Sequence, residues 1–506
     1  MPSNTARIAK NTLMLYFRQI LIMLVSLYTV RVVLNTLGVE DYGIYNVVAG
    51  VVTMFGFLSG SMAAASQRYF AFEIGRGDFE QLKKIFSLSF LIYVLIAALI
   101  LVLAETIGLW FVNNKLVIPP ERMDAARWVY HFSILSFLFT VLTTPYMAAI
   151  IAHEDMNIYA YVSIVETALK LGIVFLLRII LADKLQLYGI LLCVVALVST
   201  TIYRAICKVK YQECKVTFYW NKNLFKEITG YTGWNLFGAS VGIFKYQAVN
   251  ILLNQFFNPV VVATRGIAAQ VNGAVVNFSQ NFSTAIRPQI IKNYAAGEKD
   301  KVLSLMFQGA KGTYFLMYVF ALPLVLEMPF VLSLWLKNPP EGAALFTRLA
   351  LIDALADSVS FPIMAAAQAT GHIKLYQALV GGILLLNLPI SWIALSCGAP
   401  AAAVMVIAIM ITIAAFLVRL VLVKRLIDFS LFSFCKKVVL PIAAVSLFAA
   451  IIPVVIYVNA DEHLFRFCTV FAASIVSACG WMYAIGLNTV ERQQVRVMIK
   501  KSVFHR

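Results

Sequence analysis

Charged residues are scarce in this chain of 506 amino acids. Asp, Glu, Lys and Arg make up only 13% of it, whereas 61% of the residues are hydrophobic and the mean hydropathy is +0.85. A soluble protein carries about a quarter charged residues, so the composition argues against a soluble enzyme or binding protein. Apolar stretches long enough to cross a bilayer as helices recur throughout, and they lack the alternation of membrane barrel strands.

Motifs of metal and transfer chemistry are also missing. The seven cysteines form no C-x-x-C pair, which argues against a disulfide framework and a zinc site. The sequence has neither D-x-D nor H-E-x-x-H, and no Gly-rich loop precedes a helix as a phosphate cradle. The loops on one membrane side are too short for the catalytic residues of a membrane glycosyltransferase or polymerase. We therefore expect a protein that is not an enzyme and has no metal or other cofactor.

The apolar stretches predict an all-α integral membrane protein with about fourteen transmembrane helices. We place these helices near residues 13–37, 43–70, 85–112, 127–151, 160–181, 188–206, 230–255, 260–284, 303–333, 345–369, 376–397, 401–423, 438–458 and 466–487. The N-terminus lacks the short apolar core and cleavage site of a removable signal peptide, so the first helix is expected to stay.

Basic residues gather in alternate loops and set the expected orientation. The chain has 41 Lys and Arg residues against 24 Asp and Glu residues, a net charge of +17. The positive-inside rule places the basic loops and both termini in the cytoplasm, which requires an even number of spans. Much of the charge therefore reports topology, and the short loops offer no folded basic surface for nucleic acid.

One phrase occurs twice in the chain. "PYMAAIIAHEDMNIYA" begins at Pro145 and "PIMAAAQATGHIKLYQ" begins at Pro362, and "LWFVNNKLVIPPE" is echoed by "LWLKNPPE". These landmarks keep their order and membrane side across spans one to six and seven to twelve, which indicates a parallel repeat with a pseudo-two-fold axis. Each proline can kink its helix, and the alanines permit close helix packing, so the phrase is either a packing elbow or part of a transport device.

The repeat predicts the domain organisation. A six-helix lobe is expected at 1–206 and a second at 230–423, joined by a cytoplasmic linker at 207–229. A further linker at 424–437 leads to helices 13 and 14 at 438–487 and a cytoplasmic tail at 488–506. Two facing lobes are the architecture that supports alternating access.

Residues 1–90 resemble a known family. "LNTLGVEDYGIYNVV" and "SQRYFAFEIGRGD" are similar to segments of the Wzx-type polysaccharide flippases of the MOP superfamily, relatives of MATE drug exporters and the lipid II flippase MurJ. The resemblance implies a bacterial inner-membrane protein that moves undecaprenyl-pyrophosphate-linked oligosaccharide from the cytoplasmic to the periplasmic leaflet. The translocated oligosaccharide would serve O-antigen or capsule synthesis, and the polysaccharide polymerase machinery would be a partner. The resemblance also implies a central, cationic cavity.

Several cations lie within the predicted spans, where an ionised side chain usually faces a cavity or a partner. The candidates for binding pyrophosphate are Lys245, Arg31, Arg265, Lys170 and Arg18. Arg18 and the shallower Lys311 are also positioned to reach the cytoplasmic interface. Lys170 follows Glu166 by four residues, so a local ion pair is the alternative to ligand contact. Lys245 has no acid at such spacing, which leaves a cavity role or an acid on another helix.

Amides form polar stripes on two neighbouring spans. Gln270, Asn277 and Asn281 fall on one helix face, as do Gln247, Asn250 and Asn254. Amides suit sugar hydroxyls or cavity water, and they equally suit hydrogen bonds between helices. Both uses stay open.

Buried carboxylates are candidates for ion coupling. Asp353 and Asp357 stand one turn apart in the tenth span, and Glu166 lies in the fifth. Such groups can carry H⁺ or bind Na⁺, or they can neutralise Lys245, Arg348 or another cation.

Three rival functions share parts of this pattern. A MATE-type exporter of cationic drugs shares the topology but calls for an acid-lined cavity, and a MurJ-like lipid II flippase is chemically closer. A membrane glycosyltransferase or polymerase is disfavoured by the missing catalytic loop.

Overall fold

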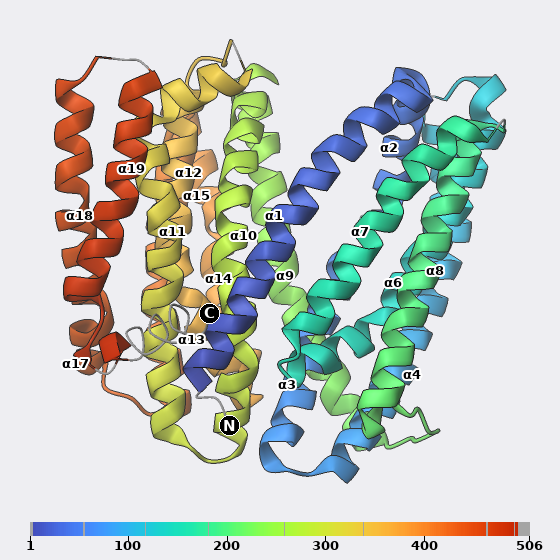
Figure 1. Ribbon diagram of the computed structural model, residues 1–506, viewed down its shortest axis with the longest axis horizontal. Coiled ribbons are helices and arrows are strands. Elements are labelled where there is room, and N and C mark those ends of the chain that lie inside the picture. Colours follow the sequence, from blue (N-terminus) through green and yellow to red (C-terminus); the bar gives the residue numbers. More distant parts are fainter. Residues whose placement is uncertain are drawn as a thin grey trace, which may run out of the picture. The chain divides into compact units, whose positions relative to one another are not determined.

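The computed structural model describes residues 4–53, 56–116, 118–180, 182–257, 259–336, 338–461, 464–489 and 491–493. These residues form helices joined by short loops, and none of them is in a strand (Figure 1). Eleven helices of the described chain are long and apolar enough to cross a membrane. The predicted all-α integral membrane fold is confirmed, and the protein is a multi-pass membrane protein.

Three of the fourteen predicted spans are helical but are not among those eleven. They correspond to α1 (Asn4–Leu37), to α2 (Val39–Thr53) with α3 (Gly56–Arg76), and to α10 (Pro259–Ala295). The count of fourteen therefore stays a prediction.

The chain divides into two compact units. The N-terminal unit is Lys10–Leu236, and the C-terminal unit is Phe237–Arg506 together with Met1–Ala9. The division falls within α9 (Lys222–Phe256), so that helix contributes to both units. The exact lobe and linker boundaries that the repeat predicts remain a proposal.

The N-terminal unit is built around two neighbouring helices, α6 and α8. Its elements after α3 are α4 (Phe79–Leu103), which continues through η1 (Ala104–Gly108) into α5 (Leu109–Lys115), then η2 (Pro120–Arg122), α6 (Met123–Ala152), α7 (Met156–Ile179), α8 (Lys184–Lys210) and η3 (Gln212–Cys214). A Cβ atom on Gly189 of α8 would lie 3.3 Å from the Cα atom of Val129 on α6. The glycine therefore lets these two backbones approach closely, as small residues do in membrane bundles.

The C-terminal unit packs its helices around α10, α11 and α16. Its elements after α10 are α11 (Lys299–Leu336), α12 (Ala343–Ser358), α13 (Ser360–Thr370), α14 (Lys374–Leu385), α15 (Asn387–Ser396), α16 (Ala403–Ile427), α17 (Leu431–Phe434), η4 (Cys435–Val439), α18 (Leu440–Asn459), α19 (Leu464–Trp481) and η5 (Met482–Gly486). A Cβ atom on Gly309 of α11 would lie 3.0 Å from Pro362 of α13. The second copy of the repeated phrase therefore packs closely against α11.

The first copy of the phrase is fastened by polar contacts instead. The ring of His153 stacks on Tyr211 with centroids 4.3 Å apart, and its Nε2 contacts Glu213. Lys210 Nζ lies 2.9 Å from Asp155, and the Tyr211 hydroxyl donates to the same carboxylate. The start of the predicted 207–229 linker is therefore fixed to the end of α6.

Two ion pairs attach the last helices to α11. Pro323 and Pro329 interrupt the hydrogen bonding of α11, and Glu327 between them has non-helical backbone angles. The buried Glu327 carboxylate accepts 2.9 and 3.0 Å hydrogen bonds from Arg466 of α19. Lys311 Nζ lies 2.8 Å from Glu491 and 3.1 Å from the Gly486 carbonyl oxygen. Lys311 is only 5% exposed, so its ammonium group is bound within the protein.

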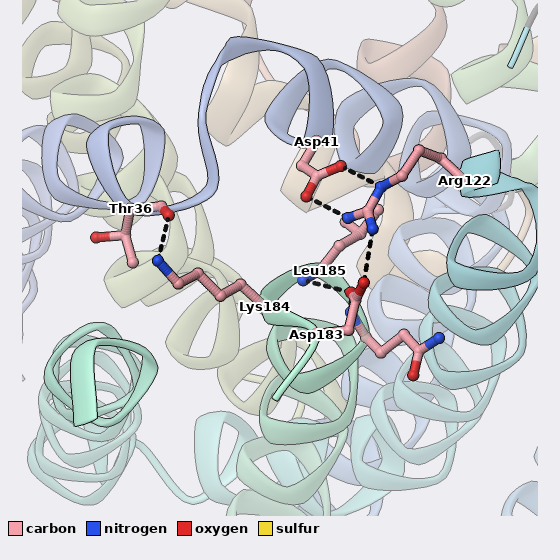
Figure 2. A network of polar contacts seen from close by, with 7 residues as sticks. Thr36, Asp41, Arg122, Asp183, Lys184 and Leu185 are labelled. Atoms are coloured by element: carbon pink, nitrogen blue, oxygen red, sulfur yellow. Dashed lines mark hydrogen bonds and ion pairs between the residues drawn. The ribbon is translucent and has the colours of Figure 1, made fainter. Parts of the chain in front are cut away.

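A charged cluster joins three loops at one end of the N-terminal unit (Figure 2). Arg122 donates to both carboxylate oxygens of Asp41 and, over 2.6 Å, to Asp183. Asp183 also caps α8 by accepting from the backbone N–H groups of Leu185 and Gln186 at 3.0 Å. Burial alone would raise the pKa of Asp183, but the Gln186 N–H and the Arg122 guanidinium together hold that pKa below its usual value. Asp41 belongs to the "VEDYG" segment, so the contact with Arg122 gives the aspartate of that segment a structural role.

Candidate functional site

The C-terminal unit encloses a polar cavity of about 200 Å³. Helices α9, α10, α12, α15 and α16 line it with mostly small apolar residues and five polar ones, Lys245, Arg265, Asn272, Asp353 and Asn387. Small side chains leave the space, and the polar groups converge on it from four different helices. The structure thus brings together three residues that the sequence singled out separately, Lys245, Arg265 and Asp353.

Positive charge prevails among the side chains that line this C-terminal cavity. Lys245 and Asp353 face the same space and interact electrostatically. The expected acid on another helix is therefore present. Arg265 is 8% exposed and donates from Nη1 to the amide oxygen of Asn250. Two basic side chains and one acidic side chain therefore line this cavity.

Three oxygen atoms on the cavity wall lack a hydrogen-bond partner among the described residues. They are Oδ1 of Asn272, of Asp353 and of Asn387. Asn387 is 1% exposed, and buried polar groups of this kind are usually paired with protein or water. These buried oxygens therefore keep an acceptor capacity that the described residues do not use. Sequence reasoning missed Asn272 and Asn387, although an Asn within the apolar run "LLLNLPIS" was a visible signal.

The two aspartates of α12 have different surroundings. Asp357 lies 2.8 Å from Arg419 of α16, and it is not among the residues that line the C-terminal cavity. Arg348 donates instead to the backbone oxygens of Val325 and Leu326, at 2.7 and 3.1 Å. The partner of Asp357 is therefore a cation that sequence reasoning did not single out.

The N-terminal unit has a second cavity, of about 350 Å³. Its charged lining residues are Arg18, Glu166 and Lys170, and its aromatic ones are Tyr45, Tyr159 and Tyr203. Lys170 Nζ donates to Glu166 over 2.6 Å, which is the local ion pair that their spacing predicted as an alternative. The Arg18 guanidinium lies 4.4 Å from the centre of the Tyr159 ring, a cation–π contact.

Hydroxyl groups make up the rest of the polar lining of the N-terminal cavity. They belong to Ser136, Thr140 and Thr143 of α6, Ser163 of α7, and Ser199 and Thr200 of α8. Residues 136, 140 and 143 are four and three residues apart, which places them on one helix face. This periodicity was present in the sequence, but serine and threonine in a membrane helix commonly bond their own backbone and give no functional signal alone.

The other predicted site residues lie outside both cavity linings. Asn254, Gln270 and Asn277 are exposed, and Asn281 is half-buried. The side chains of Arg31 and Gln247 fall outside the described part of the structure. Among the described residues, no group of three or more His, Cys, Asp or Glu is arranged to hold a metal ion.

Solved structures of similar fold are transporters. A multidrug resistance MATE family transporter of the MOP superfamily, in an outward-facing conformation, has a TM-score of 0.71 at 13% identity, over 84% of this chain and 96% of that one. A MOP superfamily transporter from Pyrococcus furiosus has a TM-score of 0.69 at 13% identity, with the same coverage of 84% and 96%. VcmN, a MATE transporter of Vibrio cholerae in the bent form, has a TM-score of 0.65 at 15% identity, over 86% and 99%. At such identities the likeness establishes the fold alone.

Sequence comparisons identify the family. No curated protein gives a significant match. The model of a family described as polysaccharide biosynthesis protein matches residues 8–293, which is more than half of the chain. That match includes both segments that resemble Wzx-type flippases and extends from α1 nearly to the end of α10. The chain therefore belongs to the polysaccharide biosynthesis protein family, the Wzx-type flippases, within the MOP superfamily fold.

Proposed function

We propose that this protein is a flippase for lipid-linked oligosaccharide. It carries undecaprenyl-pyrophosphate-linked glycan from the cytoplasmic to the periplasmic leaflet of a bacterial inner membrane, for O-antigen or capsule synthesis. The headgroup enters polar cavities of the protein while the polyprenyl tail stays in lipid. Alternating access then exposes the headgroup on the other side. Both termini face the cytoplasm in this proposal, and the polymerase machinery that consumes the flipped glycan is the expected partner.

One observation carries the choice of an anionic headgroup. The lining of the C-terminal cavity includes two basic side chains, Lys245 and Arg265, and one acidic side chain, Asp353. A pyrophosphate meets a high barrier in hydrocarbon, and fixed cations in a polar cavity lower that barrier. Arg265 can bind phosphate oxygens with its forked donors, whereas Lys245 acts as a point charge. The Pyrococcus furiosus relative is described as having a binding pocket of reverse polarity that suggests a different function for that transporter.

Asp353 is the carboxylate best placed for ion coupling. Its Oδ1 faces the cavity lining without a partner among the described residues, whereas Asp357 is bound to Arg419 and Glu166 to Lys170. We propose that Asp353 takes up H⁺ or Na⁺ as the protein cycles. The change in its charge alters its electrostatic interaction with Lys245, and thereby the attraction between Lys245 and the bound pyrophosphate. The sequence also suggested Asp357 and Glu166 for coupling, and these two carboxylates are paired with Arg419 and Lys170.

The test is translocation in liposomes that contain a defined undecaprenyl-pyrophosphate-linked oligosaccharide. Lys245→Ala and Arg265→Ala are each expected to lower the initial rate at least about tenfold, because each removes one charge-assisted contact with the pyrophosphate. Lys299→Ala is the matched control, since Lys299 is exposed at the start of α11 and lies outside both cavities. Wild-type protein that moves none of this lipid would end the proposal, and equal rates for all three variants would end the site assignment.

Two rival substrates are tested in the same liposomes. The MATE-type alternative rests on the fold likeness and predicts export of a cationic dye against a proton or sodium gradient. The MurJ-like alternative predicts faster movement of lipid II than of other glycan lipids. Rates for dye, lipid II and the oligosaccharide lipid, measured on one preparation, separate the three functions.

A further inference from the structure

The cavity of the N-terminal unit has a wall of hydroxyl groups with a defined hydrogen-bonding direction. We define this hydroxyl wall as Ser136, Thr140, Thr143, Ser163 and Thr200. Each of these hydroxyls has a carbonyl oxygen four residues earlier in its own helix as a hydrogen-bond acceptor, at 2.8 to 3.1 Å. A carbonyl oxygen can only accept, so the hydroxyl proton is committed to it.

This arrangement fixes what the wall offers to a ligand. A hydroxyl group has one proton and two lone pairs, and once the proton is used its oxygen can only accept further bonds. The Thr143 hydroxyl also reaches the Thr200 hydroxyl oxygen of α8 over 2.7 Å, and the Thr200 hydroxyl is 3.3 Å from the Phe139 carbonyl oxygen. Each hydroxyl has a single proton, so Thr143 donates it either to Thr200 or to Phe139, and both protons of the pair have an acceptor on the helices. The hydroxyl wall therefore presents lone pairs only.

Lone pairs select for ligands that carry donors. Sugar rings present O–H groups, and N-acetylated sugars add N–H groups, whereas an ionised pyrophosphate presents only acceptor oxygens, which the wall repels. We infer that the hydroxyl wall is a sugar-recognition site, so that the N-terminal cavity reads the glycan of the lipid-linked substrate. This inference rests on the proposed function and assigns one part of the substrate to one cavity.

The volume and charges of the cavity agree with this assignment. Its volume of about 350 Å³ lies within the range of roughly 300–1,000 Å³ typical of small-ligand pockets. The charge of Lys170 is balanced by Glu166, whose second oxygen is another acceptor for sugar hydroxyls. Arg18 supplies donors near Tyr159, which lies one helical turn before Ser163 of the hydroxyl wall.

The experiment removes acceptors without changing shape. Thr143→Val/Thr200→Val replaces both members of a contacting pair, so neither hydroxyl is left without its partner and the fold is expected to persist. Thr201→Val is the matched control, because Thr201 lies on the same helix with the same backbone bond, 2.8 Å to Leu197, but is exposed and outside the cavity. Circular dichroism and gel-filtration profiles confirm that each purified full-length variant is folded.

The probes are farnesyl pyrophosphate and farnesyl-pyrophosphoryl N-acetylglucosamine, titrated onto protein in nanodiscs. Wild type and Thr201→Val are expected to bind the sugar-bearing probe more tightly than farnesyl pyrophosphate. The double variant is expected to bind the sugar-bearing probe about three- to tenfold more weakly than wild type for each acceptor removed. Its affinity for farnesyl pyrophosphate should not change. A sugar-bearing probe that gains nothing in wild type, or a double variant that weakens both probes equally, overturns the inference while leaving the flippase proposal intact. Wild type that binds neither probe overturns both.

Discussion

The cluster around Arg122 gives the most quantitative prediction for stability. Arg122→Ala removes two hydrogen bonds to Asp41 and one to Asp183, whose side chains are 16% and 29% exposed. A hydrogen bond to a charged group contributes roughly 1.5–3 kcal/mol when buried, and solvent screening at this exposure reduces the total to about 1–3 kcal/mol. Asp183 keeps its two bonds from the start of α8, so most of the loss falls on Asp41.

The assay is thermal unfolding of the purified protein in detergent. The expected loss corresponds to a melting temperature about 3–10 °C lower for a unit of this size. Arg127→Ala is the control, because Arg127 is 48% exposed and its two contacts, 3.6 Å to Asp124 and 3.0 Å to Asn113, are both with exposed side chains, so about 0.5 kcal/mol or less should be lost. Asp41→Asn added to Arg122→Ala should restore part of the stability by removing an orphaned charge.

The same cluster predicts a pH dependence. The folded-state pKa of Asp183 lies below its unfolded value, so its contribution is present above an unfolded pKa of about 3.9 and is lost as pH falls through the folded pKa. Melting temperature should therefore fall more steeply below about pH 4 in wild type than in Arg122→Ala. Equal melting temperatures for Arg122→Ala and Arg127→Ala, or identical pH profiles, would refute the reasoning.

Three further predictions concern the C-terminal unit. Asp353→Asn should abolish the dependence of lipid translocation on a proton or sodium gradient, and a rate that still rises with the gradient would contradict its coupling role. Arg466→Ala should lower stability by about 3–5 kcal/mol because it strands the buried Glu327 carboxylate, and Arg466→Ala/Glu327→Gln should recover much of that loss in the same thermal assay. Gly309→Val should destabilise the unit by about 1–3 kcal/mol through collision with Pro362, measured against Gly382→Val, whose added side chain meets open space.

The fold class followed from composition and hydropathy because hydrocarbon imposes one requirement on every span. Backbone groups must be satisfied within the helix, so long apolar runs can be read locally. The count of spans was harder to obtain. The helices α1, α2 with α3, and α10 fall outside the eleven most apolar ones. The apolar stretches of the sequence predicted them as spans, whereas the described residues of these helices do not meet the length and hydropathy criteria that the other eleven meet.

Contacts at fixed spacing along one helix were also accessible from the sequence. The Glu166–Lys170 pair follows from four-residue spacing, because such residues are neighbours on any helix. Contacts across helices were not accessible. The pairing of Asp357 with Arg419 and of Lys311 with Glu491 depends on which helix faces come together, and these residues are 62 and 180 positions apart.

The sequence alone determined that this is a polytopic helical membrane protein with duplicated segments and cations in its spans, since these properties are carried by composition and local spacing. The tertiary structure decided which of the charged groups come together. Lys245, Arg265 and Asp353 come from three helices, and only packing places them on one cavity of the C-terminal unit. The helix backbones likewise set the hydrogen bonding of the hydroxyl wall, because their carbonyl oxygens are acceptors for its hydroxyl groups.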